Sequence, residues 1–445
     1  MPITLSQSYI SALAAFVRRP VARVFCFSGG VEHELSDDLI SWELERVSEH
    51  AAGQATLSFA SPAGQYSPGG LRGDWLVPGT RVWVQLGLRT ADRTEAVTVF
   101  TGEVEEATVR YRRLEGEVID VRLLDRAGRF LRQQLTSPLY VGQQANDIVR
   151  DLFTSFGGLE PGEISLDVAD YIIPQLQFVE ETLYDAGMLA LQAAGRRIFF
   201  DATGILRSAP LGVPATANWE LSDGNTLLWV RETAGKPTAT RVLVTGRLGD
   251  PVRQVGEETL WEEVTASDYD GAIMVEVPFR PAGALYEDIR LEVVTELAPT
   301  EQVALYRQSD TGITVRVVSP GGRAIIFRCL GRQVYYTTPY VTGTAVDAEL
   351  MARFGERSAE YCNPAVATDA DAQALAELLL DEARRAQFSV ELCLLTHPGI
   401  EPGDLLAWPH PRTADVLQIL VMSVTHRGGR GMAETTRVIG SMFNV

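Results

Sequence analysis

The five histidines are the residues whose type most readily suggests chemistry. They are His33, His50, His397, His410 and His426, and the last three fall within thirty residues of one another. None of them shows the His-x-x-x-His or His-Glu-x-x-His spacing that places two ring nitrogens on one helix face for a metal ion. His397 and His410 each precede a proline, as residues in turns often do. We therefore expect solvated loop histidines, with a metal site as the alternative, and we predict no metal ligand.

Residues suited to hydrolysis are present but lack the order that hydrolases need. The chain has no Gly-x-Ser-x-Gly turn to hold a serine nucleophile. Adjacent carboxylates occur at Glu180-Glu181 and Glu262-Glu263, but a glycosidase needs two carboxyl groups that face each other across a sugar. The glycine-rich segments 67–73 and 427–431 lack the order of a phosphate-binding loop and are interpreted as turns. No catalytic residue and no cofactor is predicted.

Charge excludes several classes of protein. The net charge of −19 disfavours a reader of nucleic acid or a protein of anionic membrane surfaces, because both need clustered basic residues. The negative charge has two possible roles. It either keeps the chain soluble or forms an acidic wall along which DNA slides without sticking. Lys236 is the only lysine among 39 basic residues. Arg427 and Arg430, in segment 427–431, are either contacts for an acidic partner subunit or part of an ordinary hairpin tip.

The cysteines and the hydropathy pattern indicate a reduced globular protein. Cys26, Cys329, Cys362 and Cys393 have neither zinc-type nor disulfide-type spacing, so buried thiols are expected. No apolar run reaches the ~18 residues of a membrane-spanning helix, and the first residues lack the charged leader of a secretory signal. We expect no membrane insertion and synthesis in a bacterial cytoplasm. A chain of 445 residues is long enough for roughly two to four domains.

The first third of the chain alternates apolar and polar residues with the period of strands. Six such segments predict a barrel or sandwich: residues 23–27, 39–47, 55–59, 81–88, 96–109 and 116–124. The loop 61–78 is long and rich in Gly and Pro. It suits either a partner-binding loop or a surface loop that orders only on assembly, if at all.

Helical periodicity begins after residue 139. Residues 143–156 and 182–194 place apolar side chains on one face, and a hairpin over 196–208 follows the stop at Gly195. Residues 139–212 are therefore interpreted as a compact α+β domain. Strand patterns return at 227–244 and recur in the block 250–343, over residues 273–278, 289–295, 313–318 and 324–329.

The C-terminal part contains the clearest helix. In residues 369–387, apolar side chains recur at the spacing of one helical face. A strand follows over 388–394, and the turn Glu401-Pro402-Gly403-Asp404 opens another strand that ends at Trp408. This order predicts one helix laid against an antiparallel sheet.

Several of these segments together resemble a known family. The segment Leu350-Met351-Ala352-Arg353-Phe354-Gly355-Glu356-Arg357 forms a hydrophobic-x-x-Phe-Gly-x-Arg element, and the capped helix, the strand and the Pro-Gly-Asp turn follow it. This order resembles the C-terminal part of bacteriophage tail hub proteins, including baseplate hubs and the hubs of tail-like injection systems and gene transfer agents. The run 178–210 is also similar to the family, in which a helix leads into a Phe-x-Asp-x-x-Gly hairpin.

The resemblance and the residue patterns together imply a mainly β fold with α+β elements. Two tube-like antiparallel β-barrel domains are expected, at residues 1–138 and, split by an insertion, at 213–249 with 344–445. A small α+β domain at 139–212 and an inserted β-rich domain at 250–343 complete the chain. Helix 369–387 is expected to buttress the second barrel. The residues expected to matter are structural: Pro78, Gly79, Trp83, Phe354, Gly355, Arg357, Pro402, Gly403, Asp404 and Trp408.

An internal comparison is independent of any family. Val77-Pro78-Gly79-Thr80 and Glu401-Pro402-Gly403-Asp404 both open a strand, with Trp83 or Trp408 five or six residues after the proline. A strand and its hairpin partner follow in both places, over 101–109 with 115–123 and over 418–425 with 433–439. The match is either a duplication or a chance likeness between β-domains. If it is a duplication, three chains in a ring present six similar barrels.

The resemblance implies a structural, non-enzymatic tail hub. We expect a homotrimeric ring that adapts a six-fold tail tube to a three-fold spike, in the tail tip or baseplate of a virion or phage-like particle. The implied partners are a tail tube or distal tail protein, a spike, tip or fibre protein, and the tape-measure protein, with DNA only in transit. One alternative is a tail-associated cell-wall hydrolase or peptidase with its active site in residues 250–343. Another is an unrelated carbohydrate-binding β-protein.

Overall fold

The computed structural model describes most of the chain. The described residues are 5–13, 20–48, 52–67, 69–89, 93–112, 116–221, 227–249, 252–267, 271–280, 284–337, 339–410 and 415–444. They form two compact units, one made of Met1–Arg247 with Val341–Val445 and the other of Leu248–Tyr340. The expected mainly β fold is confirmed, because one large antiparallel sheet organises the first unit and two small sheets form the second.

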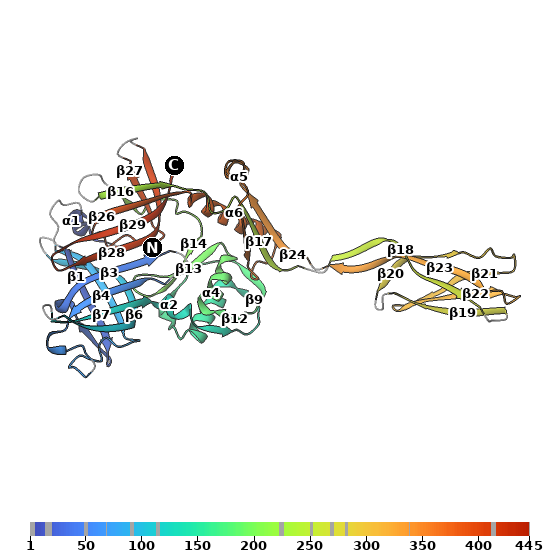
Figure 1. Ribbon diagram of the computed structural model, residues 1–445, viewed down its shortest axis with the longest axis horizontal. Coiled ribbons are helices and arrows are strands. Elements are labelled where there is room, and N and C mark those ends of the chain that lie inside the picture. The colour runs from blue at the N-terminus through green and yellow to red at the C-terminus, as the bar shows by residue number, and fades with distance from the viewer. Residues whose placement is uncertain are drawn as a thin grey trace. The chain divides into compact units, whose positions relative to one another are not determined.

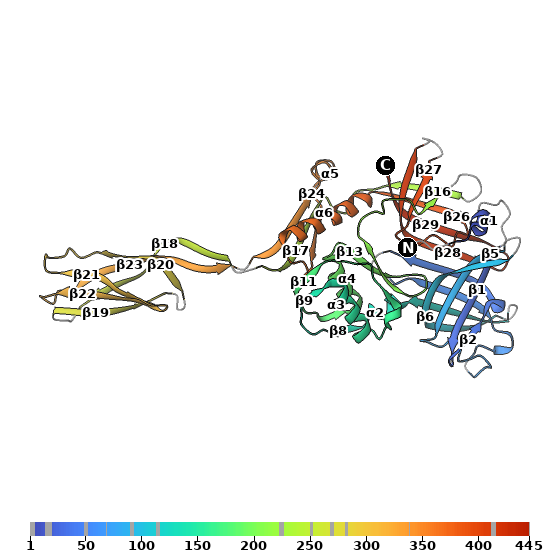
Figure 2. The same ribbon diagram turned by 180° about the vertical axis from the view of Figure 1, so that it is seen from behind.

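A thirteen-stranded sheet runs through the larger unit (Figures 1 and 2). Its order is β16-β26-β29-β28-β3-β4-β7-β6-β5-β1-β2, and β27, which pairs with β28 and β15, lies off this path. The N-terminal strands are β1 (Pro20–Ser28), β2 (Val31–Glu34), β3 (Leu39–Val47), β4 (Gln54–Ala60), β5 (Arg81–Arg89), β6 (Thr94–Arg112) and β7 (Gly116–Asp125). The C-terminal strands are β15 (Trp219–Glu220), β16 (Leu227–Ala234), β26 (Phe388–Leu395), β27 (Leu405–Pro409), β28 (Val416–Gly429) and β29 (Met432–Asn444).

Each half of this sheet has its own hydrophobic core. Leu57, Phe59 and Phe100 are almost fully buried in the N-terminal half, and Ile419 and Trp408 in the C-terminal half. Side chains that alternate along a strand face opposite sides, so one side of each strand fills the core. The strands expected in two tube-like domains are continuous in one sheet, because β28 pairs with β3.

A small α+β segment follows the first half of the sheet. Its helices are α2 (Arg126–Phe130), α3 (Ala145–Asp151), which runs into a π-helical turn at Leu152–Phe156, and α4 (Leu183–Gln192). Its strands are β8 (Gln134–Thr136), β9 (Tyr140–Gln144), β10 (Ile164–Ser165), β11 (Ile172–Leu176), β12 (Val179–Thr182), β13 (Arg196–Phe200) and β14 (Leu206–Pro210). The helix expected from residue 143 begins at Ala145 instead, because Gln143 and Gln144 pair with β11.

The helix predicted at 369–387 is confirmed as α6 (Asp369–Arg385). Thr368 caps its start, where its hydroxyl accepts a hydrogen bond from Asp371 N at 3.2 Å. Its apolar face joins the core of the α+β segment, and its backbone lies directly against Gly343, where a side chain would collide with Ala372. Beside it lie β17 (Arg241–Leu248), β24 (Tyr340–Val346), α5 (Ala348–Phe354) and β25 (Ser358–Cys362).

The second unit is built from two three-stranded sheets around its own core. Trp261, Phe279 and Tyr286 pack ring against ring in that core. One sheet contains β18 (Val252–Ala266), β23 (Ile325–Thr337) and β20 (Leu285–Val293), and the other contains β19 (Gly271–Pro278), β22 (Gly312–Ser319) and β21 (Gln302–Gln308). Among the described residues, no helix combines the length and the apolar character needed to cross a membrane.

Candidate functional site

The two Pro-Gly turns have the same internal geometry. Thr80 N donates to Val77 O at 3.0 Å, and Asp404 N donates to Glu401 O at 3.1 Å. Gly79 and Gly403 hold the third position of each turn with φ of 87° and 90°. Side chains strain this backbone conformation, so glycine is the residue that fits both turns.

The bonds that attach these turns to the sheet also match. Gly79 N donates to Val104 O at 2.8 Å, and Val104 N donates to Thr80 O at 2.9 Å. In the other turn Gly403 N donates to Val421 O at 2.7 Å, and Val421 N donates to Asp404 O at 2.9 Å. Val104 on β6 and Val421 on β28 are therefore equivalent positions.

This equivalence extends over five strands. The register of β6 with β7 shifts between Val104 and Glu106, and that of β28 with β29 shifts between Val421 and Ser423. A second pair of shifts lies between Leu39 and Ser41 on β3 and between Leu227 and Trp229 on β16. A chance likeness does not reproduce two bulges at matching positions. We call β3-β4-β7-β6-β5 the N-module and β16-β26-β29-β28-β27 the C-module.

The two tryptophans that the sequence comparison matched are not equivalent. Trp83 pairs with Thr101, whereas Trp408 pairs with Leu417, the counterpart of Phe100. A shift of one residue turns a side chain to the opposite face of a strand. Trp83 accordingly stacks on Phe25, with ring centroids 5.7 Å apart, while Trp408 is 1% exposed in the core of the C-module.

The two modules meet along β3 and β28. Seven antiparallel residue pairs join them, from Ser41–Gly429 to Val47–Ser423. At the hairpin tip Arg427 donates to Glu43 Oε1 at 2.6 Å, and Arg430 donates to Asp37 O. The tip arginines thus bind acidic β3 and the segment before it in the same chain.

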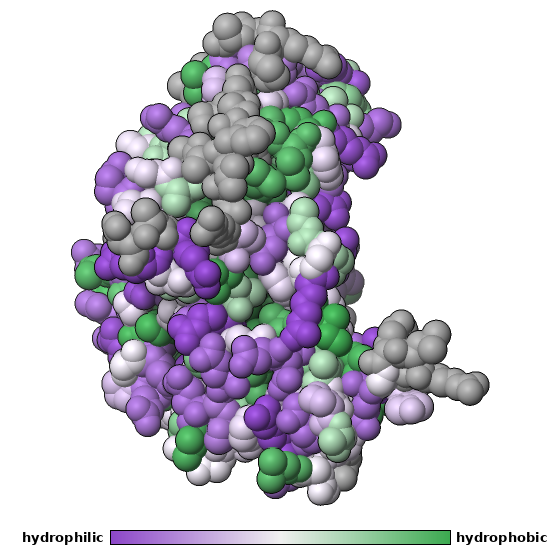
Figure 3. All heavy atoms as spheres, turned by 90° about the vertical axis from the view of Figure 1, so that its left-hand side faces the viewer, coloured by the Kyte–Doolittle hydropathy of each residue, from purple (hydrophilic) through white to green (hydrophobic). Residues whose placement is uncertain are grey.

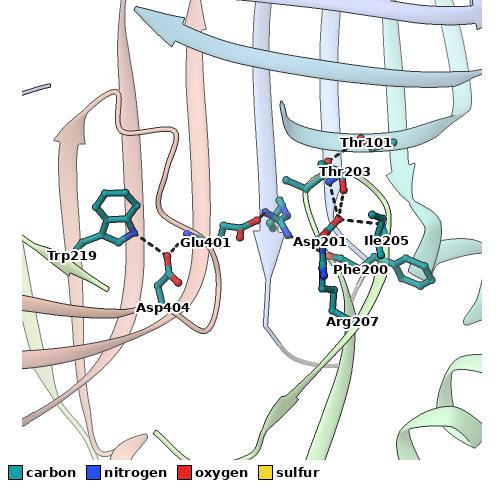
Figure 4. A network of polar contacts seen from close by, with 11 residues as sticks. Thr101, Phe200, Asp201, Thr203, Ile205, Arg207, Trp219, Glu401 and Asp404 are labelled. Atoms are coloured by element: carbon teal, nitrogen blue, oxygen red, sulfur yellow. Dashed lines mark hydrogen bonds and ion pairs between the residues drawn. The ribbon is translucent and has the colours of Figure 1, made fainter. Parts of the chain in front are cut away.

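A buried ion pair crosses this seam (Figure 4). Arg46 Nη1 on β3 donates to Glu401 Oε1 at 2.7 Å, and Arg46 Nη2 donates to Phe200 O at 3.3 Å. Both residues are less than a tenth exposed, so the removal of one partner would leave the other charge buried and uncompensated. Sequence reasoning missed this pair. A signal was present, because Arg46 follows Trp42 and Leu44 on the apolar side of β3.

The turn of the C-module belongs to the same network. Asp404 Oδ2 accepts from Trp219 Nε1 at 3.1 Å and from Glu401 N at 3.0 Å (Figure 4). Desolvation by burial raises the pKa of Asp404 to about 6, although both hydrogen bonds oppose the shift. A cleft of about 230 Å³ opens beside these residues and is lined by acidic and basic groups.

The hairpin between β13 and β14 ties the α+β segment to the seam. Asp201 Oδ1 accepts from Thr203 N at 2.9 Å and from Ile205 N at 3.0 Å, and Arg207 Nε donates to Asp201 Oδ2 at 2.7 Å. Thr101 Oγ1 on β6 donates to Ala202 O at 2.8 Å. These bonds explain the Phe-x-Asp-x-x-Gly pattern, because Asp201 closes the turn that places Phe200 O beside Arg46 (Figure 4).

The Phe-Gly-x-Arg element forms a separate anchor around Thr240. Phe354 ends α5, and Gly355 follows with φ of 81°. Thr240, which is fully buried, donates its hydroxyl to Gly355 O at 3.2 Å and accepts from Arg357 N at 2.9 Å. Arg357 Nη1 donates to Pro237 O at 2.9 Å. The element therefore fixes the approach to β17.

Two expectations about single residues are wrong. His397 and His426 are buried, not solvated, and Cys362 is exposed where a buried thiol was expected. Burial, assisted by the charge of Arg46, lowers the pKa of His426 to about 3, so its ring is neutral at neutral pH. His50 lies outside the described residues. No group of three or more His, Cys, Asp or Glu side chains in the described part of the chain is arranged to hold a metal.

The adjacent carboxylates of the second unit are held by arginines. Arg280 Nε lies 2.8 Å from Glu262 Oε2, and Arg328 Nε lies 2.6 Å from Glu263 Oε2. Neighbouring residues of a strand point to opposite faces, so these two groups do not form one facing pair at this position.

Comparison with known proteins gives a likeness in structure alone. Neither a family model nor a curated protein matches the chain. The tail protein from Neisseria meningitidis MC58 is similar, with a TM-score of 0.56 and 10% identity over 95% of this chain and 96% of that chain. The 43 kDa tail protein of prophage MuSo2 from Shewanella oneidensis has a TM-score of 0.52 and 12% identity over 94% and 98%. The resemblance seen in the sequence is thus confirmed at the level of the fold, which this chain shares with phage tail proteins.

Proposed function

We propose that the chain is a structural, non-enzymatic tail hub protein that acts as a trimeric ring. The ring joins a six-fold tail tube or distal tail protein to a three-fold spike, tip or fibre protein. Its lumen holds the tape-measure protein and then passes DNA, and its acidic charge keeps DNA from sticking. The chain belongs to the tail tip or baseplate of a virion or phage-like particle.

The equivalence of the N-module and the C-module is the observation that supports this proposal most strongly. A chain with two like modules supplies six of them when three chains close a ring. Such a ring has three-fold symmetry in sequence and nearly six-fold symmetry in shape. It therefore matches both a hexameric and a trimeric partner without a change in any subunit.

Electron cryomicroscopy of particles from the producing bacterium tests the proposal. We expect three copies of the chain around the channel at the end of the tail, and an antibody to the chain should label the same place. A particle without the chain, or a single copy outside any ring, would refute the proposal.

The rival hydrolase needs a separate assay. The isolated segment 248–340 is applied to a gel that contains peptidoglycan, and a lysozyme lane serves as the positive control. We expect no cleared band. Clearing that disappears on heat denaturation would favour the hydrolase.

A further inference from the structure

The N-module and the C-module each have a strand edge that lacks a strand partner within the described residues. β6 pairs with β7 along most of its length, but β5 covers it only up to Glu103, so the other edge of Glu106–Arg112 is open. β16 pairs only with β26 and ends the sheet. The side chains beside both edges are exposed: Tyr111 is 76% exposed and Trp229 45% exposed. β6 and β16 lie at separate places on the sheet in both ribbon views (Figures 1 and 2).

Inside the chain, the counterparts of these two edges are paired with each other. β28 is the counterpart of β6, and β3 is the counterpart of β16. The outer edge of β28 from Ser423 to Gly429, beyond the part covered by β27, pairs with β3. The chain thus shows how an edge of the β6 kind accepts an edge of the β3 kind. The N-module has the first edge free, and the C-module has the second edge free.

We propose that the open β6 edge of one chain pairs with the β16 edge of a second copy, in the antiparallel register of β28 with β3. Val424 faces Arg46 at the internal seam, and their counterparts are Ala107 and Ala234. Ala107 therefore faces Ala234 of the next chain, Thr108 faces Thr233, and Tyr111 faces Val230. This inference deepens the proposed ring, and rests on it, because it states which strands close the ring.

Backbone groups would supply most of the affinity of this pairing. Each open edge presents a row of N–H and C=O groups that only another strand satisfies fully. On the face drawn in Figure 3, hydrophobic residues form small groups separated by hydrophilic ones. At the two edges charged residues interrupt the apolar ones, at Glu106 and Arg110 on β6 and at Arg231 and Glu232 on β16, so pairing of strand edges suits them better than the burial of a broad apolar patch.

Charge at one end of the pairing is complementary. At the internal seam the Ser48 hydroxyl lies 3.9 Å from Met422 Sδ. Their counterparts are Lys236, the only lysine, and Glu105, which already contacts Arg132 at 2.7 Å. The Lys236 ammonium group would thus approach Glu105 and its neighbour Glu106. The counterparts of the Glu43–Arg427 ion pair in the proposed seam are Arg231 and Arg110. The positive charge of Arg110 is compensated by Asp120 of β7 in the same chain.

Each chain has one edge of each kind, so the contact is head to tail. Such contacts form closed rings when the rotation between copies divides a full turn. In a trimer, three internal seams of β28 with β3 would alternate with three seams of β6 with β16. All six seams would then share one register.

A cysteine pair tests this register. Ser48 N donates to Met422 O at 2.8 Å, which makes Val47–Ser423 a non-hydrogen-bonded pair and, by alternation, Glu45–Thr425 another. The counterparts of that second pair are Thr233 and Thr108. Residues in such pairs have Cα atoms about 4.5 Å apart, within the range of a disulfide.

The full chain is prepared with Cys362→Ser, Thr108→Cys and Thr233→Cys and is oxidised mildly. We expect disulfide-linked dimers and a closed covalent trimer.

Three controls and a second variant make the result decisive. Each single cysteine variant should give no more than a dimer, and Val109→Cys with Thr233→Cys should cross-link poorly because residue 109 faces the other side. Val109→Pro removes an N–H that points to the open edge and not to β7. It should prevent the association while thermal melting and circular dichroism stay unchanged.

The outcomes separate this inference from the proposed function. If the chain is a trimer by native mass spectrometry but the matched pair cross-links no better than the face-flipped pair, another surface closes the ring and this inference fails alone. If the chain stays monomeric at all concentrations and no variant cross-links, the two edges do not pair. Disulfide trapping also registers weak association, so that result refutes the inference. The location of the chain in the tail is decided independently by microscopy.

Discussion

At the scale of single residues, Asp404 makes the seam sensitive to pH. Burial raises its pKa from 3.8 to about 6, so the folded chain holds this proton more tightly than the unfolded chain does. The free energy of unfolding therefore falls as pH rises through the interval between these two values. His426 acts in the opposite direction, because its lowered pKa makes the fold lose stability as pH falls below 6.5.

Asp404→Asn isolates the acidic contribution. Asparagine keeps the oxygen that accepts from Trp219 and from Glu401 N but cannot ionise. We expect the variant to be more stable than the unmodified chain at pH 7, by up to about 3 kcal/mol, and equal to it near pH 4. Denaturant unfolding at several pH values measures this. Burial also raises the pKa of Asp125 to about 6, so part of the dependence of unfolding free energy on pH should remain in the variant. If Asp404→Asn left this dependence unchanged, the assignment to Asp404 would be contradicted.

At the scale of elements, the two Pro-Gly turns set where β5 and β27 begin. Gly79→Ala and Gly403→Ala each place a side chain on a backbone with positive φ, and each should cost about 1–2 kcal/mol of unfolding free energy. Gly403→Ala should cost at least as much, because its Cβ would lie 2.9 Å from Arg197 Nη2 while nothing lies near that of residue 79.

A matched control for these turns is Gly162→Ala. Gly162 has no positive φ, and no atom of another residue lies close to the point that an alanine methyl group would occupy there. This change should therefore stay within about 0.5 kcal/mol. Thermal or denaturant unfolding compares all three variants. If Gly79→Ala and Gly403→Ala were as neutral as the control, the turns would not require glycine.

The sequence predicted those elements whose pattern is local. Helix α6 was predicted to within two residues at its end, because its apolar period is regular over seventeen residues. The match of strands 101–109 and 418–425 proved to be in register. Short β2 and the largely exposed β18 escaped prediction, because neither has a clear buried face. The seam of β3 with β28 joins residues far apart in the chain, so no local sequence pattern predicted this pairing. The burial of His426 could not be predicted for the same reason.

At the scale of the whole molecule, the chain leaves the larger unit and returns to it at adjacent points. β17 and β24 are neighbours in one sheet, and Gly249 N donates to Pro339 O at 2.8 Å. The segment between them has its own core, in which Phe327 and Val315 are fully buried. A segment whose two ends lie close together and that has its own core can be inserted without a change in the core of the larger unit.

Excision of the second unit tests this independence. Residues 250–338 are replaced by a short Gly-Ser linker, which the adjacent ends allow. Because the cores are separate, we expect the shortened chain to melt within a few degrees of the larger unit in the full chain. The isolated segment 248–340 should give its own cooperative transition. Scanning calorimetry of the three proteins measures this, and the full chain should show both transitions.

A shortened chain that is insoluble, or a segment without a transition, would show that the two units fold as one. A shortened chain that still forms the cross-linked trimer would place ring closure in the modules alone.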